Sequence, residues 1–291
     1  VEELYEIKWS QQRLFRFTWA VIIGRVTSIL EKIVETTRGQ MARRRAQCPL
    51  SELESRLVDL PPVRGFIDAI ADSRDVALIA EIKKASPSAG LIRADFDPLE
   101  LATTYAASGA TCLSCLTDEP FFQGRLEDLV AVAEAVDRPV LRKDFLVDRY
   151  QLLEARVAGA DAVLLIAECL DGCELSELYL AAGELGLDVL LEIYEPENLS
   201  RALDLDPRLL GINNRNLKTF ETDLGHTLRL AADVPATTML VAESGIRSRE
   251  DVECLAAGGV KAILVGETLM RAESVAEKTG ELVGVPRVVR H

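Results

Sequence analysis

From residue 77 onward, short apolar segments alternate along the chain with longer amphipathic ones. Each apolar segment has four to six residues and is mostly apolar on both faces, which is typical of strands in a parallel sheet covered by helices. We expect eight such strands, at Ala77–Ile82, Cys112–Leu116, Pro139–Arg142, Ala162–Ile166, Val189–Glu192, Leu209–Asn213, Thr238–Glu243 and Ala262–Val265.

The segments between these strands have a helical period and end in small or glycine-containing turns. We expect helices at Pro98–Ser108, Leu126–Val136, Arg149–Ala158, Glu174–Leu185, Pro196–Leu203 and Arg249–Ala257. Eight strand–helix units in about 200 residues predict a (β/α)8 barrel, the TIM barrel. A doubly wound sheet is the alternative, but it usually carries a glycine-rich fingerprint after its first strand, and Lys83-Lys84-Ala85-Ser86 is not one.

The residues before the first strand fall into two parts. Residues 28–70 are expected to form additional N-terminal helices that cap or wrap the barrel, the first of them beginning at a capping box of Ser28 and Glu31. Residues 1–25 do not match this pattern, and we interpret them as a peripheral extension or a mis-assigned start, with the native chain beginning near Val26. Residues 26–291 are then one barrel domain.

Composition narrows the function. The chain has 291 residues, 48% of them hydrophobic, which is enough for a sizeable core. A formal charge of -14 disfavours nucleic acid and anionic membranes as partners, and Leu14–Gly24 is too short to span a bilayer. Because His226 and His291 are the sole histidines, a multi-histidine metal site is nearly excluded, and no metal is expected.

The six cysteines lack the spacing of a secreted disulfide scaffold, which favours a reducing, cytoplasmic location. Cys112 and Cys115 form a C-x-x-C pair inside a predicted strand, where residues three apart point to opposite faces. We therefore interpret them as buried thiols rather than as a metal or redox site.

Polar residues recur where the predicted strands end. The first strand places Glu81 and Lys83 on one face at its carboxyl end, and the equivalent positions of later strands carry Lys143, Glu192, Asn213, Arg215, Glu243 and Ser244. Each could be an ordinary polar residue, and Glu81 and Lys83 could be a solvated surface pair. Since all strand ends of a barrel converge, the set together predicts an active site there.

Glycines after the last two strands predict a phosphate site. Ser244-Gly245 and Gly266-Glu267 let backbone N–H groups approach a ligand, and a short helix at Glu267–Arg271 directs its amino end there. Simple turns are the alternative for these residues taken by themselves.

Seven segments in order resemble one known family, indole-3-glycerol phosphate synthase. They are AEIKKASPSAGLIR from Ala80, LTDEPFFQG from Leu116, VLRKDFLVDRYQ from Val140, GADAVLLIA from Gly159, GINNRNLKTFETDL from Gly211, VAESGI from Val241 and LVGETLMR from Leu264. The resemblance covers about residues 28–272.

The resemblance implies a carbon–carbon lyase of tryptophan biosynthesis that acts without a cofactor. Its substrate, 1-(2-carboxyphenylamino)-1-deoxyribulose 5-phosphate, is a small anion that closes to an indole ring with loss of carbon dioxide and water. A protein with a charge of -14 must then concentrate positive charge at the site, at Lys83, Lys84, Lys143 and Arg215.

The resemblance also implies roles. Lys143 would be the general acid of ring closure, Glu192 would stabilise positive charge or remove a proton, and Glu81 with Lys83 would serve the dehydration. Asn213 and Arg215 would orient the substrate, and Ser244 belongs to the catalytic set. The aromatic ring would lie among Phe122, Phe145, Leu164 and Leu217. The phosphate would lie near Lys83, Ser86, Ser244, Gly245, Gly266 and the backbone of Glu267, a position where many relatives carry serine.

Two other functions are compatible with a phosphate-binding barrel. Another enzyme, such as phosphoribosylanthranilate isomerase or the tryptophan synthase α subunit, would lack the KDF and NNRNL segments. A non-catalytic barrel that binds a phosphorylated metabolite would not need the acid–base set of Glu81, Lys83, Lys143 and Glu192. The sequence does not predict an oligomeric state, and a monomer is compatible with it.

Overall fold

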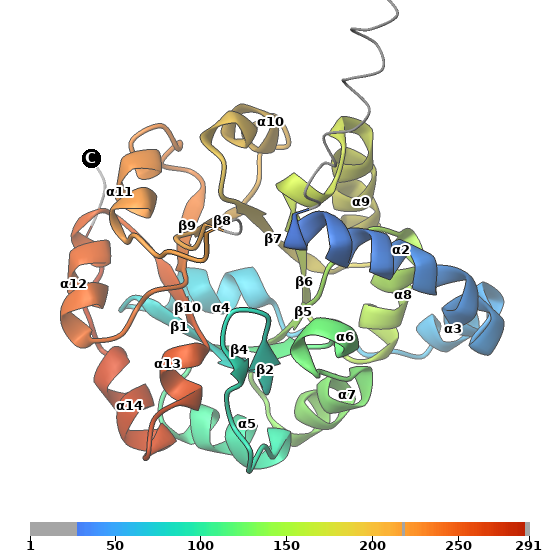
Figure 1. Cartoon of the computed structure of the whole chain (residues 1–291), viewed down its shortest axis with the longest axis horizontal. Coiled ribbons are helices and arrows are strands. Elements are labelled where there is room, and N and C mark those ends of the chain that lie inside the picture. The colour runs from blue at the N-terminus through green and yellow to red at the C-terminus, as the bar shows by residue number, and fades with distance from the viewer. Residues whose placement is uncertain (1–27, 217–218, 289–291) are drawn as a thin grey trace, which may run out of the picture.

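The computed structural model of the chain describes residues 28–216 and 219–288, which form a closed barrel of eight parallel strands surrounded by helices (Figure 1). The TIM-barrel prediction is therefore confirmed. The barrel strands are β1 (Ala77–Ile82), β4 (Cys112–Leu116), β5 (Val140–Lys143), β6 (Ala162–Ile166), β7 (Asp188–Ile193), β8 (Leu209–Asn213), β9 (Met239–Glu243) and β10 (Ala262–Val265).

The barrel closes between its first and last strands. Ala77 of β1 pairs with Ala262 of β10, while Ile79 of β1 pairs with Cys112 of β4. Each strand of the ring thus has two neighbours, and no open edge remains. Nearly all strand residues are buried, which explains why the strands are apolar on both faces.

The outer ring consists of helices that follow the strands. They are α5 (Pro98–Ala107), α7 (Leu126–Ala135), α8 (Arg149–Val157), α9 (Gly172–Glu184), α10 (Leu199–Leu203), α11 (Gly225–Ala231), α12 (Arg249–Ala257) and α14 (Val275–Leu282). The predicted strand and helix ends agree to within two residues, except that the helix predicted at 196–203 begins as a 3-10 turn, η2 (Pro196–Asn198), before α10. The predicted glycine ends are also seen, since Gly109 and Gly159 have φ of 96° and 85°.

The helices α11 and α14 were not among the predicted segments, and the barrel also carries several shorter elements. These shorter elements are the hairpin of β2 (Ala85–Ser86) and β3 (Gly90–Leu91), the 3-10 turn η1 (Ala167–Cys169), and the helices α6 (Glu119–Phe122) and α13 (Glu267–Met270). Of these, only α13 was expected, as a helix one residue longer. Elements of two to four residues are too short to show a period in the sequence.

Between residue 28 and β1 the structure has three helices: α2 (Ile29–Gln47), α3 (Leu50–Leu57) and α4 (Phe66–Asp72). The capping box at Ser28 is present, because its Oγ accepts from Glu31 N at 3.1 Å and Glu31 Oε2 accepts from Ser28 N at 2.8 Å. The proposed extension at 1–25 lies outside the described residues.

The amino ends of β5, β6 and β7 are held by the ion pair of Arg64 with the buried Asp161 and by α4. Arg64 donates from Nε to Asp161 Oδ2 at 2.8 Å, and the same oxygen accepts from Val140 N at 2.7 Å. On the next strand, Asp188 Oδ2 accepts from Ile67 N of α4 at 2.8 Å. Polar groups at this end therefore serve the closure of the barrel.

Among the described residues, the longest helices are too short or too polar to cross a bilayer.

Candidate active site

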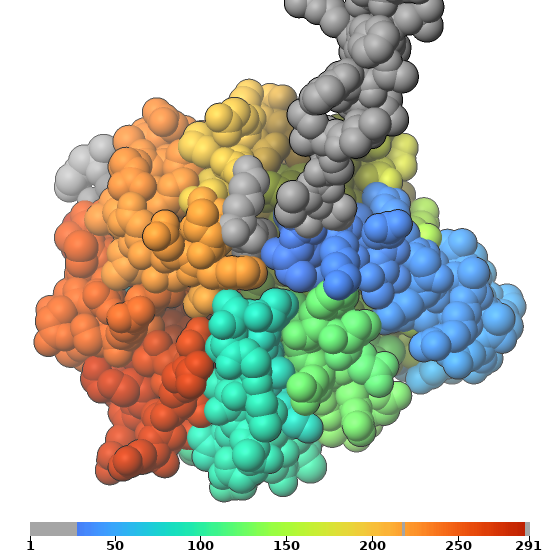
Figure 2. Space-filling view, in the orientation of Figure 1, coloured from blue at the N-terminus to red at the C-terminus, as the bar shows by residue number. Residues whose placement is uncertain are grey.

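A cavity of about 1100 Å³, counting the open space at its mouth, lies at the carboxyl ends of the barrel strands. On this face, α2, the segment around β2 and the orange segment after β8 meet over the barrel (Figure 2). With the exception of Lys84, the predicted site residues that the structure describes line the cavity: Glu81, Lys83, Ser86, Phe122, Lys143, Phe145, Leu164, Glu192, Asn213, Arg215, Ser244, Gly245, Gly266 and Glu267. Leu217 lies outside the described residues, and Lys84 does not line the cavity.

Lys143 is the last residue of β5, and its side chain lies between those of two glutamates. Its Nζ lies 3.1 Å from Glu192 Oε2, at the end of β7, and 3.4 Å from Glu243 Oε2, at the end of β9. Burial by itself would lower the pKa of Lys143, but the charges of Glu192, Glu243 and Glu81 raise that pKa well above its usual value. The ammonium therefore stays protonated at neutral pH.

The pKa values of Glu192 and Glu243 are shifted in opposite directions. Burial would raise the pKa of Glu192, but Lys143 and the hydrogen bond from Asn213 Nδ2, 3.1 Å from Glu192 Oε1, lower it. Burial and the charge of Glu192 raise the pKa of Glu243. Glu192 is thus the more acidic of the two carboxyl groups and the closer partner of Lys143, whereas Glu243 is the more readily protonated one.

Gly211 of β8 leaves room for the Glu243 side chain. A Cβ atom on Gly211 would lie 2.3 Å from Glu243 Oε1, so no larger residue fits there without displacing the carboxyl group. Within the described chain, Glu243 Oε1 is buried and has no hydrogen-bond partner. The cavity therefore holds an unused acceptor beside the Lys143–Glu192 pair.

Glu81 and Lys83 form a second, separate pair. Glu81 Oε2 lies 2.6 Å from Lys83 Nζ, and both side chains are largely buried. A Cβ on Gly266, after β10, would lie 2.0 Å from Glu81 Oε2 and 3.0 Å from Lys83 Nζ, so the glycine allows this pair to sit against the backbone.

Arg215 connects three segments at the rim. Its Nη1 donates to Ser88 Oγ at 2.9 Å, its Nη2 lies 3.0 Å from Glu267 Oε2, and its backbone N donates to Asn213 Oδ1 at 3.0 Å. Glu267 also pairs with Arg271 at 3.0 Å, and these hydrogen bonds outweigh burial and lower the pKa of Glu267. The Glu267 carboxylate is therefore an anion held by two arginines beside the cavity.

Apolar side chains form the wall and the roof. The rings of Phe122, on α6, and Phe145, after β5, have centroids 6.0 Å apart, and Leu164 of β6 lines the same cavity. Ile29, Leu30 and Ile33 of α2 also line it. Charged side chains and apolar side chains thus line the same cavity.

After β9 the backbone turns sharply. Ser244 and Gly245 have φ of 66° and 80°, and the conformation is unusual for serine. Asn214 Nδ2 donates to Ser244 O at 3.3 Å, which supports the turn. This strained backbone lies at the predicted phosphate site, next to Gly266.

Some residues of the cavity were not assigned from the sequence. Glu243 was noticed at a strand end but received no role, although it ends β9 as Glu192 lies near the end of β7. The roof residues of α2, with Ser88 and Phe220, carry no strand-end signal, because they come from segments whose position depends on tertiary contacts.

The cysteines and acidic residues do not form a further site. All six cysteines are free, and Cys112 and Cys115 are buried. Among the described residues, no group of three His, Cys, Asp or Glu side chains is placed to hold a metal ion.

The family model for indole-3-glycerol phosphate synthase matches residues 30–282 of this chain. The chain belongs to the indole-3-glycerol phosphate synthase family. Relatives of that name include one from Rhodopirellula baltica, 57% identical over 256 residues that cover 88% of this chain and 99% of the relative, and one from Rhodospirillum rubrum, 51% identical over 263 residues that cover 89% and 100%. The predicted lyase of tryptophan biosynthesis is thereby confirmed.

More distant solved structures share the fold with this family member. A 3-hexulose-6-phosphate synthase from Salmonella typhimurium has a TM-score of 0.59 at 14% identity, covering 71% of this chain and 96% of its own. A thiamine phosphate pyrophosphorylase from Pyrococcus furiosus has a TM-score of 0.53 at 17% identity, covering 72% and 94%. At these identities the likeness shows the barrel alone.

Proposed function

We propose that this chain makes indole-3-glycerol phosphate in the cavity at the carboxyl ends of its strands. The aromatic carbon that bears the carboxylate bonds to the ribulose carbonyl carbon, and the carbonyl oxygen takes a proton. The carboxylate then leaves as carbon dioxide. Loss of the new hydroxyl group as water, with one proton taken from the adjacent CH₂ carbon, completes the indole ring.

Lys143 is the proton donor of ring closure. Its support is the position of Nζ between Glu192 and Glu243, because these carboxyl groups keep the ammonium protonated at neutral pH and hold it at the centre of the cavity. Glu192, the ionised partner, stabilises the positive charge that develops on the substrate nitrogen. This pair is the observation that carries the proposal.

Glu81 and Lys83 handle the proton transfers of dehydration. Their 2.6 Å contact places an acid and a base together in the same cavity as Lys143. Ser244 lies beside this set, and its strained backbone orients it toward the same space.

The anionic ends of the substrate meet the cations of the rim. Arg215 and Asn213 hold the carboxylate end, since Arg215 is already directed by Ser88 and Glu267. The phosphate lies near Lys83, Ser86, Gly245 and Gly266, with only the backbone N–H of Glu267 able to contribute. Phe122, Phe145 and Leu164 enclose the aromatic ring.

The other partner and location predictions stay part of this proposal. A charge of -14 supports a small anionic substrate held by local cations rather than nucleic acid or an anionic membrane. Six free thiols support a reducing, cytoplasmic setting.

The test is the appearance of indole fluorescence when the purified chain receives the carboxyphenylamino-deoxyribulose phosphate. Lys143→Met should lower kcat by a factor on the order of 100 or more, because it removes the proton donor and keeps the length of the side chain. The matched control is Lys84→Met, which removes a neighbouring ammonium that does not line the cavity and should keep near-normal turnover. Equal activity of the two variants would reject the role of Lys143, and no fluorescence from the unaltered chain would reject the function.

A further inference from the structure

Strand β5 carries two cations that point to opposite sides of the barrel wall. Lys143 faces the cavity, and the alternation of a strand turns the preceding residue, Arg142, outward beneath α8. Arg142 is fully buried, yet its guanidinium donates from Nε to Thr117 Oγ1 at 3.0 Å, from Nη1 to Gln151 O at 2.8 Å and from Nη2 to Asp144 Oδ2 at 2.9 Å. A buried cation with so many partners fixes its neighbours tightly.

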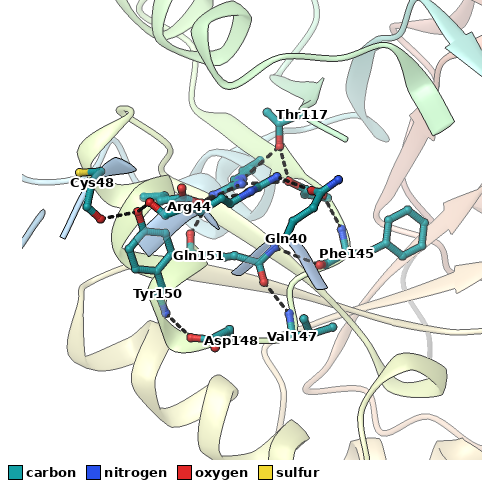
Figure 3. Close-up of polar contacts among 12 residues, drawn as sticks. Gln40, Arg44, Cys48, Thr117, Phe145, Val147, Asp148, Tyr150 and Gln151 are labelled. Carbon is teal, nitrogen blue, oxygen red and sulfur yellow. Dashed lines mark hydrogen bonds and ion pairs between the residues drawn. The ribbon is translucent and has the colours of Figure 1, made fainter. Parts of the chain in front are cut away.

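The partners of Arg142 hold the loop that follows β5. Asp144 Oδ1 accepts from Phe145 N at 2.8 Å, and Gln151 Nε2 donates to Phe145 O at 3.1 Å. Gln151 Oε1 accepts from Val147 N at 2.9 Å, and Figure 3 shows Gln151 between Phe145 and Val147. Both polar groups of the Phe145 backbone are therefore held by side chains, next to Lys143.

The same cluster reaches α2 through Glu154. Its Oε2 lies 3.4 Å from Arg142 Nη1 and 3.2 Å from Arg44 Nη1 on α2, so one carboxylate oxygen is shared by two guanidiniums. The single hydrogen of Tyr150 OH is shared between Cys48 O at 2.8 Å and Arg44 O at 3.2 Å, which secures the end of α2 (Figure 3). The beginning of α2 roofs the cavity.

We propose that Arg142, Glu154 and Arg44 are positioning residues that couple the docking of the roof helix α2 to the placement of Lys143 and Phe145 in the cavity. This inference rests on the proposed function, in which Lys143 is the proton donor. Two guanidiniums balance the carboxylates of Asp144 and Glu154 within the cluster. Without Arg44, Glu154 has Arg142 as its remaining cation and draws that guanidinium from Asp144 and Thr117. The 3.4 Å contacts leave room for this movement.

Arg38 offers a matched control on the same helix. It tethers α2 to α9 through Glu174 at 2.7 Å, but this pair is at the surface and has no contact with the cluster. Arg38→Gln and Arg44→Gln each remove one ion pair between α2 and the barrel. Only the second disturbs the chain of contacts that ends at Phe145.

The experiment compares kcat and KM of the unaltered chain with those of Arg38→Gln, Arg44→Gln and Arg44→Lys. We expect Arg44→Gln to lower kcat roughly tenfold, because small displacements of catalytic groups have large effects on rate. Arg44→Lys should recover a good part of the loss, and Arg38→Gln should stay within about twofold of the unaltered kcat. Unfolding curves at the assay temperature verify that each variant is folded.

Equal kcat values for Arg44→Gln and Arg38→Gln would overturn the coupling, as would a loss confined to stability. Because the unaltered chain must itself turn over in this assay, an inactive chain would instead refute the proposed function, and the two failures are distinguishable.

Discussion

At the scale of single residues, two buried glutamates near the ends of β7 and β9 have pKa values shifted in opposite directions. Glu192 receives hydrogen bonds from Lys143 and Asn213, whereas Glu243 is buried with one oxygen unpartnered in the described chain. Like charges this close disfavour each other's ionisation, so the carboxyl group with the closer ammonium and the Asn213 hydrogen bond is the more acidic one. Gly211, between their strands, makes the arrangement sterically possible.

This difference predicts unequal effects of the same substitution. Glu192→Gln removes the charge that balances Lys143, and we expect kcat to fall by about 100-fold or more. Glu243→Gln replaces the carboxyl group with the raised pKa by a neutral amide of the same shape, so the loss should be about tenfold or less. Steady-state kinetics at pH 7 measure both, and a larger loss in Glu243→Gln would mean that the charge assignment is reversed.

Individual site residues were predictable where they end a strand. Glu81, Lys143, Glu192 and Asn213 interrupt or end apolar segments, and the barrel brings such positions together. The charge state of Glu243 was not predictable, because it depends on the distance to Glu192 across β8. The contribution of Ile29 was not predictable either, since it depends on where α2 docks.

At the scale of elements, the short helix α6 shows how a buried cap positions an aromatic wall. Asp118 Oδ1 accepts from Phe121 N at 2.8 Å and Phe122 N at 3.2 Å, although Asp118 is only 4% exposed. Burial and the nearby Asp144 raise the pKa of Asp118 to about 6. The helix has four residues, too few for a sequence period, which is why it was not predicted.

The raised pKa of Asp118 makes the free energy of unfolding depend on pH. The pKa of the Asp118 carboxyl group is higher in the folded chain than in the unfolded chain. Its contribution to the free energy of unfolding is therefore fully present below pH 4 and is lost as the pH rises through 6. The loss amounts to ~3 kcal/mol at pH 7. Asp118→Asn keeps the helix cap and removes the titrating group. The free energy of unfolding of this variant, minus that of the unaltered chain, should therefore increase between pH 4 and pH 7.

Urea unfolding of both chains across this pH range measures the difference, and titration of the groups that do not interact with Asp118 cancels in it. Parallel stability curves would contradict the raised pKa of Asp118.

At the scale of the whole molecule, the two ends of the barrel have different roles, one in catalysis and one in stability. Catalytic side chains gather at the carboxyl ends of the strands, and the opposite end holds the Arg64–Asp161 pair, whose guanidinium also donates to Ala133 O, Val136 O and Gly159 O. The alternation of segments was sufficient to predict this architecture, because eight strands covered by helices have few other closed arrangements. The contacts of Arg64 were not predictable, since they join segments far apart in the sequence.

Loss of Arg64 should therefore affect stability without affecting chemistry. Arg64→Ala leaves Asp161 as an uncompensated buried charge, and we expect the unfolding free energy to fall by ~3–5 kcal/mol with kcat unchanged well below the transition temperature. Arg208→Ala removes the exposed pair with Asp68 near the same end and should cost less than ~1 kcal/mol.

Chemical denaturation and kinetics on the same preparations test both substitutions. A fall in kcat for folded Arg64→Ala would show that the two ends of the barrel are not independent.

The pairing of β1 with β10 has a consequence for synthesis on the ribosome. Because Ala77 of β1 pairs with Ala262 of β10, the β1 edge that faces β10 stays unpaired until residue 262 has been synthesised. A nascent chain therefore exposes the hydrogen-bonding groups of that edge during most of its elongation. Fragments that stop before residue 262 are expected to associate through that edge, and chaperone demand should drop once the final strand emerges.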